Sequence, residues 1–207
     1  MLKHHNLRKE ILLCCITLFA LTLNAQQSVN LLELIQSKNA NIKKIEGNLV
    51  ENDYLHNGKT HHYDGKVYYD SNSKVALLYD NGDKIVVNGE KICLDHGMFH
   101  GTFNVKRNKT MRMMQQMLLL SFQGRCQELA DAFNYTISTQ TKENDYLVIL
   151  DTKNKKLLSF THLVFHYRKT DFRLEKMELT ASNGDVDVYD INDAKYNGKV
   201  DASVFEL

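Results

Sequence analysis

The chain has 207 residues, of which 43% are hydrophobic and 25% are charged, and this composition excludes the collagen-like, low-complexity and intrinsically disordered classes. Lys and Arg number 26 against 25 for Asp and Glu, so the net charge of +1 favours neither nucleic acid nor an anionic membrane surface as the main partner. The chain contains no proline, which excludes polyproline segments and proline-rich spacers. One compact domain is expected.

Residues 1–25 have the pattern of a secretory signal peptide. Three basic residues precede an apolar run from Ile11 to Leu23, and the small residue Ala25 follows it. The run has about 13 residues, fewer than the roughly 20 that a membrane-spanning helix needs. The sequence therefore predicts a cleaved signal peptide at 1–25, a secreted single domain at 26–207, and no integral membrane segment.

Two cysteines, Cys93 and Cys126, lie outside the predicted signal peptide. In a secreted protein they could form a disulfide, which would close a loop of about 30 residues and stabilise the fold by on the order of 3 kcal/mol. Sequence separation does not establish that their Cα atoms come within bonding reach. Two buried free thiols are the alternative.

A short helix is predicted first, over Ser28–Ser37, where a serine can cap the first turn. The apolar period then changes to two, and Asn81-Gly82 and Asn88-Gly89 are typical of two-residue hairpin turns. Consecutive strands are therefore expected to be antiparallel. The strands predicted in this half are Ile42–Glu51, Thr60–Asp70, Lys74–Asp80, Lys84–Val87 and Lys91–Asp95.

The segment Lys109–Phe133 is predicted to be helical, broken at Gly124. It is expected to cover a second apolar face of strands such as Val75–Tyr79, whose residues are apolar on both sides. Strands then resume, and apolar residues that change phase in two of them, within 172–179 and 186–191, indicate bulges. These later strands are Tyr135–Ser138, Tyr146–Asp151, Leu157–Tyr167, Phe172–Thr180 and Asp185–Ile191.

About ten antiparallel strands with helices on one face predict an α+β fold. The phase changes further predict that the antiparallel sheet is curved around an apolar interior. Methionines are concentrated in the predicted helical cover, where Met111, Met114 and Leu118 form the main stripe. Met113 lies off that stripe, four residues before Met117. Flexible thioethers suit an acyl ligand, and the alternative is an ordinary core helix that is rich in methionine.

The sequence offers only weak signals for a metal-binding or catalytic site. The spacing of Cys93, His96 and His100 resembles half of a metal site, but the other half is missing, so exposed histidines are the preferred interpretation. Asp185 and Asp187 could serve a calcium ion or a glycosidase, although their alternation with valines favours a solvated strand face. We therefore predict no catalytic residue, no metal and no cofactor.

In order and spacing, these elements resemble the LolA/LolB family of periplasmic lipoprotein carriers. The similarity covers essentially all of residues 28–207 and depends on a series of weak motifs. The matching segments are the N-terminal helix, Ile45–Leu49, Gly65–Tyr69, Val75–Tyr79, Val87–Lys91, the inserted helices, Phe160–Tyr167, Leu174–Thr180 and Asp201–Phe205. The resemblance implies an open half β-barrel whose concave apolar face is covered by helices and receives acyl chains of a lipoprotein.

Two features depart from the family pattern. Ser71-Asn72 stands where the family usually has an Arg-Pro pair, whose arginine holds the helical cover closed, and the sequence ends at Leu207 without the longer tail of many carriers. Control of the cover and transfer of the cargo are expected to differ accordingly. A relative that binds another lipid therefore stays open as an alternative.

The sequence thus predicts a monomeric periplasmic chaperone for lipoproteins, served by a membrane-bound donor complex. The alternatives are a secreted hydrolase built on a curved sheet and an envelope domain that binds a lipid or a partner protein. A polar cluster inside the cavity would favour the hydrolase. The residues expected to contact acyl chains are Leu49, Val67, Leu77, Val86, Met111, Met113, Met114, Met117, Leu118, Val148, Leu163 and Phe165.

Overall fold

The computed structural model describes residues 31–97, 99–152 and 159–207. The predicted signal peptide and the start of the N-terminal helix lie outside this part of the chain. The described residues contain one antiparallel sheet of eleven strands, in the order β6-β5-β4-β3-β2-β1-β11-β10-β9-β8-β7. The strands β6 and β7 are the two edges and do not pair with each other, so the sheet is an open barrel.

The strands agree closely with the predicted ranges, and β6 is an additional strand that the sequence pattern did not indicate. The bounds are β1 (Lys44–Tyr54), β2 (Thr60–Asp70), β3 (Lys74–Tyr79), β4 (Lys84–Asn88), β5 (Lys91–His96), β6 (Phe99–Asn104), β7 (Tyr135–Thr141), β8 (Asp145–Thr152), β9 (Phe160–Arg168), β10 (Leu174–Ala181) and β11 (Val186–Tyr196). Among the described strands, each pairs with the next one along the chain except β6 with β7, between which the chain passes through the helices. In addition, the last strand β11 pairs with the first strand β1.

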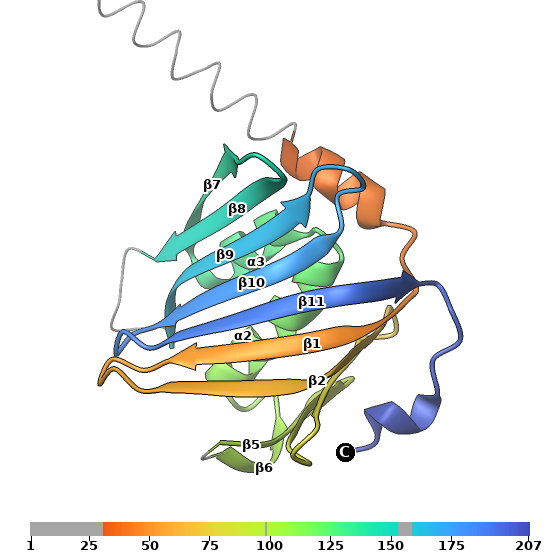
Figure 1. Cartoon of the computed structure of the whole chain (residues 1–207), viewed down its shortest axis with the longest axis vertical. Helices are drawn as coiled ribbons and strands as arrows, with labels where there is room; N and C mark the ends of the chain where they lie inside the picture. The colour runs from red at the N-terminus through yellow and green to blue at the C-terminus, as the bar shows by residue number, and fades with distance from the viewer. Residues whose placement is uncertain (1–30, 98, 153–158) are drawn as a thin grey trace, which may run out of the picture.

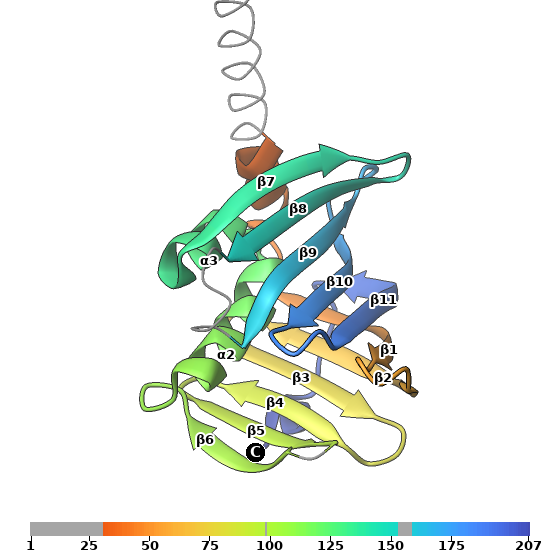
Figure 2. The ribbon, with the colours of Figure 1, turned by 90° about the vertical axis from the view of Figure 1, so that its left-hand side faces the viewer.

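The helices α2 (Lys109–Phe122) and α3 (Cys126–Phe133) lie on one side of the curved sheet, as Figure 2 shows. The side chain of Asn108 caps α2 by accepting a hydrogen bond from the backbone N–H of Met111 at 3.2 Å. The α+β fold with helices over a curved antiparallel sheet is therefore confirmed. In Figure 1 both helices are seen behind the sheet.

Gly124 separates α2 from α3 and has two structural reasons to be glycine. Its φ of +67° lies in the left-handed region, and an added Cβ would come within 2.8 Å of the side chain of Ile35. Ile35 belongs to the N-terminal helix, of which residues 31–39 are described, and it is completely buried. The turn at Gly124 between α2 and α3 is therefore also the place where the N-terminal helix packs, through Ile35.

The bulge predicted in β10 is confirmed, whereas the register shift of β11 lies beyond the predicted place, between Asn192 and Lys195 in its pairing with β1. The pairing of β10 with β9 shifts register between Leu174 and Lys176, which explains the change of phase there. In β11, pairing with β10 is regular from Val186 to Asp190. Val186 and Val188 simply lie on the outer face of the sheet, opposite to Tyr189, so the bulge predicted at this place is wrong.

Candidate functional site

The inner face of the sheet and the two helices enclose one continuous apolar cluster. All but one of the residues expected to contact acyl chains belong to it or pack against it. They are Leu49, Val67, Leu77, Met111, Met113, Met114, Met117, Leu118, Val148, Leu163 and Phe165. Side chains fill this interior in the described structure, so an acyl chain can enter only if the helices move away from the sheet.

Val86 is the exception, and its assignment to the interior is corrected. It lies on the outer face in a second cluster with Ala76, Cys93 and Phe205. Side chains alternate along each strand, so Val86 points away from its neighbours Ile85 and Val87. The apolar outer side of β3–β5 is therefore covered by the C-terminal segment with the short helix η1 (Ala202–Phe205), and not by the helices at 109–133 as predicted.

The disulfide predicted as one alternative does not form, because the two cysteines are free thiols on opposite faces of the sheet. Cys93 lies in the outer cluster, whereas Cys126 begins α3 in the interior and its sulfur is 3.1 Å from the hydroxyl of Tyr167. Burial raises the pKa of the Cys126 thiol to about 12, although the hydrogen bond with Tyr167 lowers it.

Cys93 and Cys126 are expected to resist alkylation in the native protein, because both are buried and the thiolate is the reactive form. Treatment of the oxidised, folded protein with iodoacetamide, followed by peptide mapping, measures this. Both thiols should be labelled once the protein is unfolded without a reductant. A cross-linked pair of peptides would contradict the structure.

Helix α2 presents a different methionine stripe to the sheet from the one predicted. Met113 and Met117 are 1% and 2% exposed and lie at the centre of the buried face, while Met114 is only half-buried. The buried face of α2 is therefore turned about the helix axis relative to the predicted one. Met111 and Leu118 lie at its sides and not at its centre. Met113 also receives a weak contact from the hydroxyl of Tyr135, 3.6 Å from its sulfur.

Neutral hydrogen bonds tie α2 to the sheet. Near its middle, the side chain of Gln115 donates to the carbonyl oxygen of Gly89 in the β4–β5 turn. At its end, the hydroxyl of Tyr167 donates to the carbonyl oxygen of Ser121 at 2.8 Å. Just beyond the helix, the Gln123 amide donates to the hydroxyl of Tyr69 at 2.9 Å. A typical neutral hydrogen bond adds only about 1 kcal/mol net, so these ties position the helix without fixing it strongly.

Ser71-Asn72, the predicted departure from the family pattern, forms the turn between β2 and β3. The backbone N–H of Ser71 donates to the carbonyl oxygen of Lys43, and that of Asn72 donates to Asp70. Neither of these contacts reaches the helical segment. Tyr69, the penultimate residue of β2, makes the contact with the helical segment instead, through its hydroxyl and Gln123.

A cluster of ionisable side chains that was not predicted from the sequence lies on the inner face, near the β1–β2 and β5–β6 hairpins. Glu51 and Asp53 come from β1 and His96 from β5, and one candidate ligand atom of each lies within 4.8 Å of the others. The Nε2 atom of His96 is 3.4 Å from a carboxylate oxygen of Glu51, and its Nδ1 is 3.0 Å from Asp83. The hydroxyl of Tyr79 donates to the other oxygen of Glu51.

Burial and crowding of like charges perturb the pKa values in this cluster. The pKa of Asp53 is raised to about 7, first by burial and then by the negative charges of Glu51 and Asp187. The pKa of Asp187 is raised to about 6, again first by burial. Burial lowers the pKa of His96, but its interactions with Glu51 and Asp83 raise it by more, so the net shift is upward.

The cluster also revises the histidine and aspartate predictions. Cys93, His96 and His100 do not come together, because Cys93 lies on the outer face and His100 is exposed beside Asp95, 2.6 Å away. His96 is not an exposed histidine, since only 12% of its side chain is accessible. Asp187 pairs directly with Asp53 across β1 and β11 and is half-buried, so it does not belong to a solvated face.

One sequence signal could have located this cluster. Glu51 and Asp53 continue the inward-facing series of Ile45 and Leu49 along β1, so two acidic residues occupy apolar positions of an alternating strand. Asp187 stands in the same relation to Tyr189 in β11. The approach of His96 to Glu51 could not be predicted, because it depends on how β5 is placed relative to β1 across the three strands between them.

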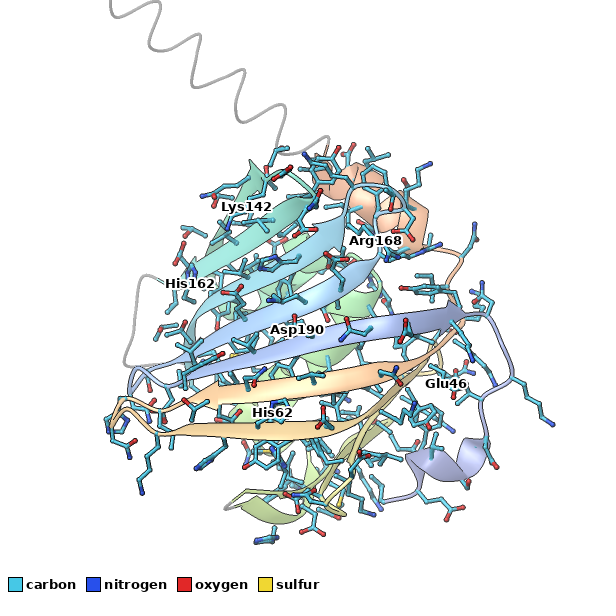
Figure 3. The ribbon with its side chains drawn as sticks, in the orientation of Figure 1. Glu46, His62, Lys142, His162, Arg168 and Asp190 are labelled. Atoms are coloured by element: carbon cyan, nitrogen blue, oxygen red, sulfur yellow. The ribbon has the colours of Figure 1, made fainter. Side chains whose placement is uncertain are left out.

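The outer face of the sheet is polar over most of the strands, as Figure 3 shows. A groove of about 790 Å³ runs over β8–β11. Residues of both signs line it: Lys176 is paired with Asp190 at 3.1 Å, and the ring of His166 lies 2.9 Å from a carboxylate oxygen of Glu178. Polar side chains on this side of the molecule include Glu46, His62, Lys142, His162, Arg168 and Asp190, which are labelled in Figure 3. The paired charges give this groove no single sign that would favour one class of ligand.

Together the fold and the site describe an open antiparallel half-barrel with a helical cover over an apolar interior. No family model matches the chain, and no curated protein matches it in sequence. Among the described residues, no helix is long and apolar enough to cross a membrane.

The chain is also similar to several solved structures, at low sequence identity. A putative outer membrane lipoprotein-sorting protein domain from Vibrio parahaemolyticus is 10% identical, with a TM-score of 0.48, over 88% of this chain and 97% of the other. A LolA superfamily protein from Nitrosomonas europaea is 11% identical, with a TM-score of 0.39, over 84% and 97%. MucB is 11% identical, with a TM-score of 0.49, over 88% of this chain and 63% of MucB.

Proposed function

We propose that this protein is a periplasmic carrier that binds acyl chains of lipoproteins or other lipids between α2 and the inner face of the sheet. The observation that supports the proposal is the apolar, methionine-rich contact between α2 and the sheet. A continuous apolar sheet face meets a helix whose buried centre is Met113 and Met117. Methionine side chains are unbranched and polarizable, so they can repack around a flexible chain.

Energetics make such an exchange feasible. Binding requires α2 to leave the sheet, which breaks its neutral hydrogen bonds and exposes apolar side chains. The acyl chain then replaces the helix as the partner of the sheet, and each buried methylene group contributes about 0.8 kcal/mol. A long acyl chain can therefore offset the cost of opening, whereas a short one cannot.

Chain length accordingly provides the test. Saturated fatty acids of increasing length should displace a fluorescent fatty-acid probe with increasing affinity, by about tenfold for each two added methylene groups. Native mass spectrometry of protein purified from its own periplasm should in addition reveal a diacyl or triacyl ligand. Affinity that does not depend on chain length, together with ligand-free native protein, would contradict the proposal.

The hydrolase alternative has one specific observation in its favour, the polar cluster around Glu51, Asp53 and His96. This cluster lies at one end of the inner face, beside Tyr79, and the apolar side chains occupy the rest. A hydrolase would turn over an ester or glycoside of the bound lipid, and the Glu51→Gln variant would lose that turnover. A carrier releases the fatty acid or lipoprotein unchanged, which mass spectrometry of the recovered ligand distinguishes.

A further inference from the structure

We propose that Glu51, Asp53 and His96 form a binding site for a divalent transition-metal ion of the Zn²⁺ type. The proposal goes beyond acyl-chain binding and does not depend on it. Two carboxylates and one imidazole are a ligand set that Zn²⁺ accepts, with water in the remaining position. The three side chains come from β1 and β5, so the rigid sheet holds the ligand set in place.

The distances fit one small ion. Ligands bound to a tetrahedral Zn²⁺ at about 2.0–2.1 Å are separated from one another by roughly 3.3 Å. The Nε2 atom of His96 and the Oε1 atom of Glu51 are already 3.4 Å apart. The candidate atom of Asp53 lies within 4.8 Å of both.

His96 is also held in the orientation of a metal ligand. Its Nδ1 atom lies 3.0 Å from Oδ2 of Asp83, which leaves Nε2 directed toward Glu51. A carboxylate behind the distal ring nitrogen is the usual support of a zinc-bound histidine, because it fixes the tautomer and the ring orientation. The ring is stacked on Tyr79 at 4.3 Å and meets the edge of Tyr63 at 4.6 Å, so it has little freedom to turn.

An oxygen atom without a partner points independently to a cation. The Oδ1 atom of Asp53 is buried and no protein donor reaches it in the described structure; the Asp53 side chain contacts the carboxyl group of Glu51, and two carboxylates can be bridged only by a proton or a cation. Such a group is costly to bury, and Glu51 beside it is only 2% exposed. Asp187 pairs with Asp53 across the strands and adds another carboxylate. A divalent ion would give the free oxygen a partner and balance the excess of carboxylates.

The imidazole ligand determines which ions should bind. Mg²⁺ and Ca²⁺ are hard cations that prefer sets of oxygen ligands, whereas Zn²⁺ and Co²⁺ accept imidazole nitrogen. Purified protein without a polyhistidine tag should therefore bind one Zn²⁺ per chain in competition with a chromophoric chelator. Mg²⁺ in large excess should not displace the ion. Bound Co²⁺ should give visible absorption bands of a low-coordinate site with a nitrogen ligand.

A second histidine–carboxylate pair supplies matched controls. His100 lies 2.6 Å from Asp95, near His96 in the chain, but this pair is exposed, and no third ligand completes it among the residues that the structure describes. His96→Gln and the nearly isosteric Asp53→Asn should abolish stoichiometric Zn²⁺ binding. Asp83→Asn should weaken it by about 10- to 100-fold, because Asp83 only orients the imidazole. His100→Gln and Asp95→Asn should bind as the unmodified protein does.

Thermal unfolding of each variant without metal shows which variants are folded. Asp53→Asn decides the question if His96→Gln does not fold. Zn²⁺ should raise the melting temperature of the unmodified protein and not that of folded Asp53→Asn. The proposal is overturned if one Zn²⁺ per chain does not bind, or if folded Asp53→Asn binds it as well as His100→Gln does. Either result leaves the fatty-acid assay of the proposed function unaffected.

Discussion

Replacing Leu77 with aspartate is expected to lower the free energy of unfolding by about 5 kcal/mol, a large part of the stability of a typical domain. Leu77 is 1% exposed and belongs to the interior cluster. The variant loses the packing of a buried leucine and in addition buries a charge without a partner. Urea unfolding followed by circular dichroism measures the loss.

The adjacent Leu78 provides the matched control, since it is the same amino acid on the opposite face of β3. Leu78 is half-buried and packs against the outer cluster. Leu78→Asp keeps its charge in contact with water, so its cost should not exceed about 2 kcal/mol. Equal losses in the two variants would contradict the assignment of the inner face.

Replacing both Met113 and Met117 with glutamine is expected to destabilise the protein without ligand by about 1 to 3 kcal/mol per site, because each amide would be buried against hydrocarbon. Both positions lie at the centre of the buried face of α2. If the same side chains also contact the acyl ligand, the double variant should in addition lose much of the stabilisation that the ligand provides. Thermal unfolding with and without a fatty acid measures both effects.

The matched control is the double replacement of Met113 and Met117 with leucine. Volume and apolar character are preserved, so stability should change by less than about 1.5 kcal/mol and the shift caused by the ligand should persist. A glutamine variant that is destabilised but keeps the full shift would mean that these methionines are ordinary core residues. The proposed contact between α2 and the acyl chain would then be wrong.

The order of elements was predictable because local signals are strong in this chain. Asn-Gly turns and period-two alternation located β3 and β4, and the helical stripe with Gly124 located α2 and α3. Strand β6 escaped prediction because it is an edge strand. Pairing with β5 alone defines it, and Gly101 interrupts its sequence with a φ of +145°.

The candidate site was predictable only in its apolar part. Leu49, Val67 and Leu163 occupy inward positions that alternation fixes once the strands are known. The rotation of α2 was not fixed in the same way, because methionines and leucines together occur nearly all round the helix. In the tertiary structure Met113 and Met117 pack against the sheet and are buried, whereas Met114 is only half-buried. The position of Val86 depended on the C-terminal segment that covers the outer face.

By itself the sequence determined the strands, the helical cover and the apolar character of the inner face, because these follow from turns and periodicities between neighbours in the chain. Only the tertiary structure decided which distant residues meet. Glu51 and His96 approach each other because the four strand pairings between β1 and β5 set their register and the curvature of the sheet brings them together. The same geometry separates Cys93 from Cys126, since the sheet itself lies between them.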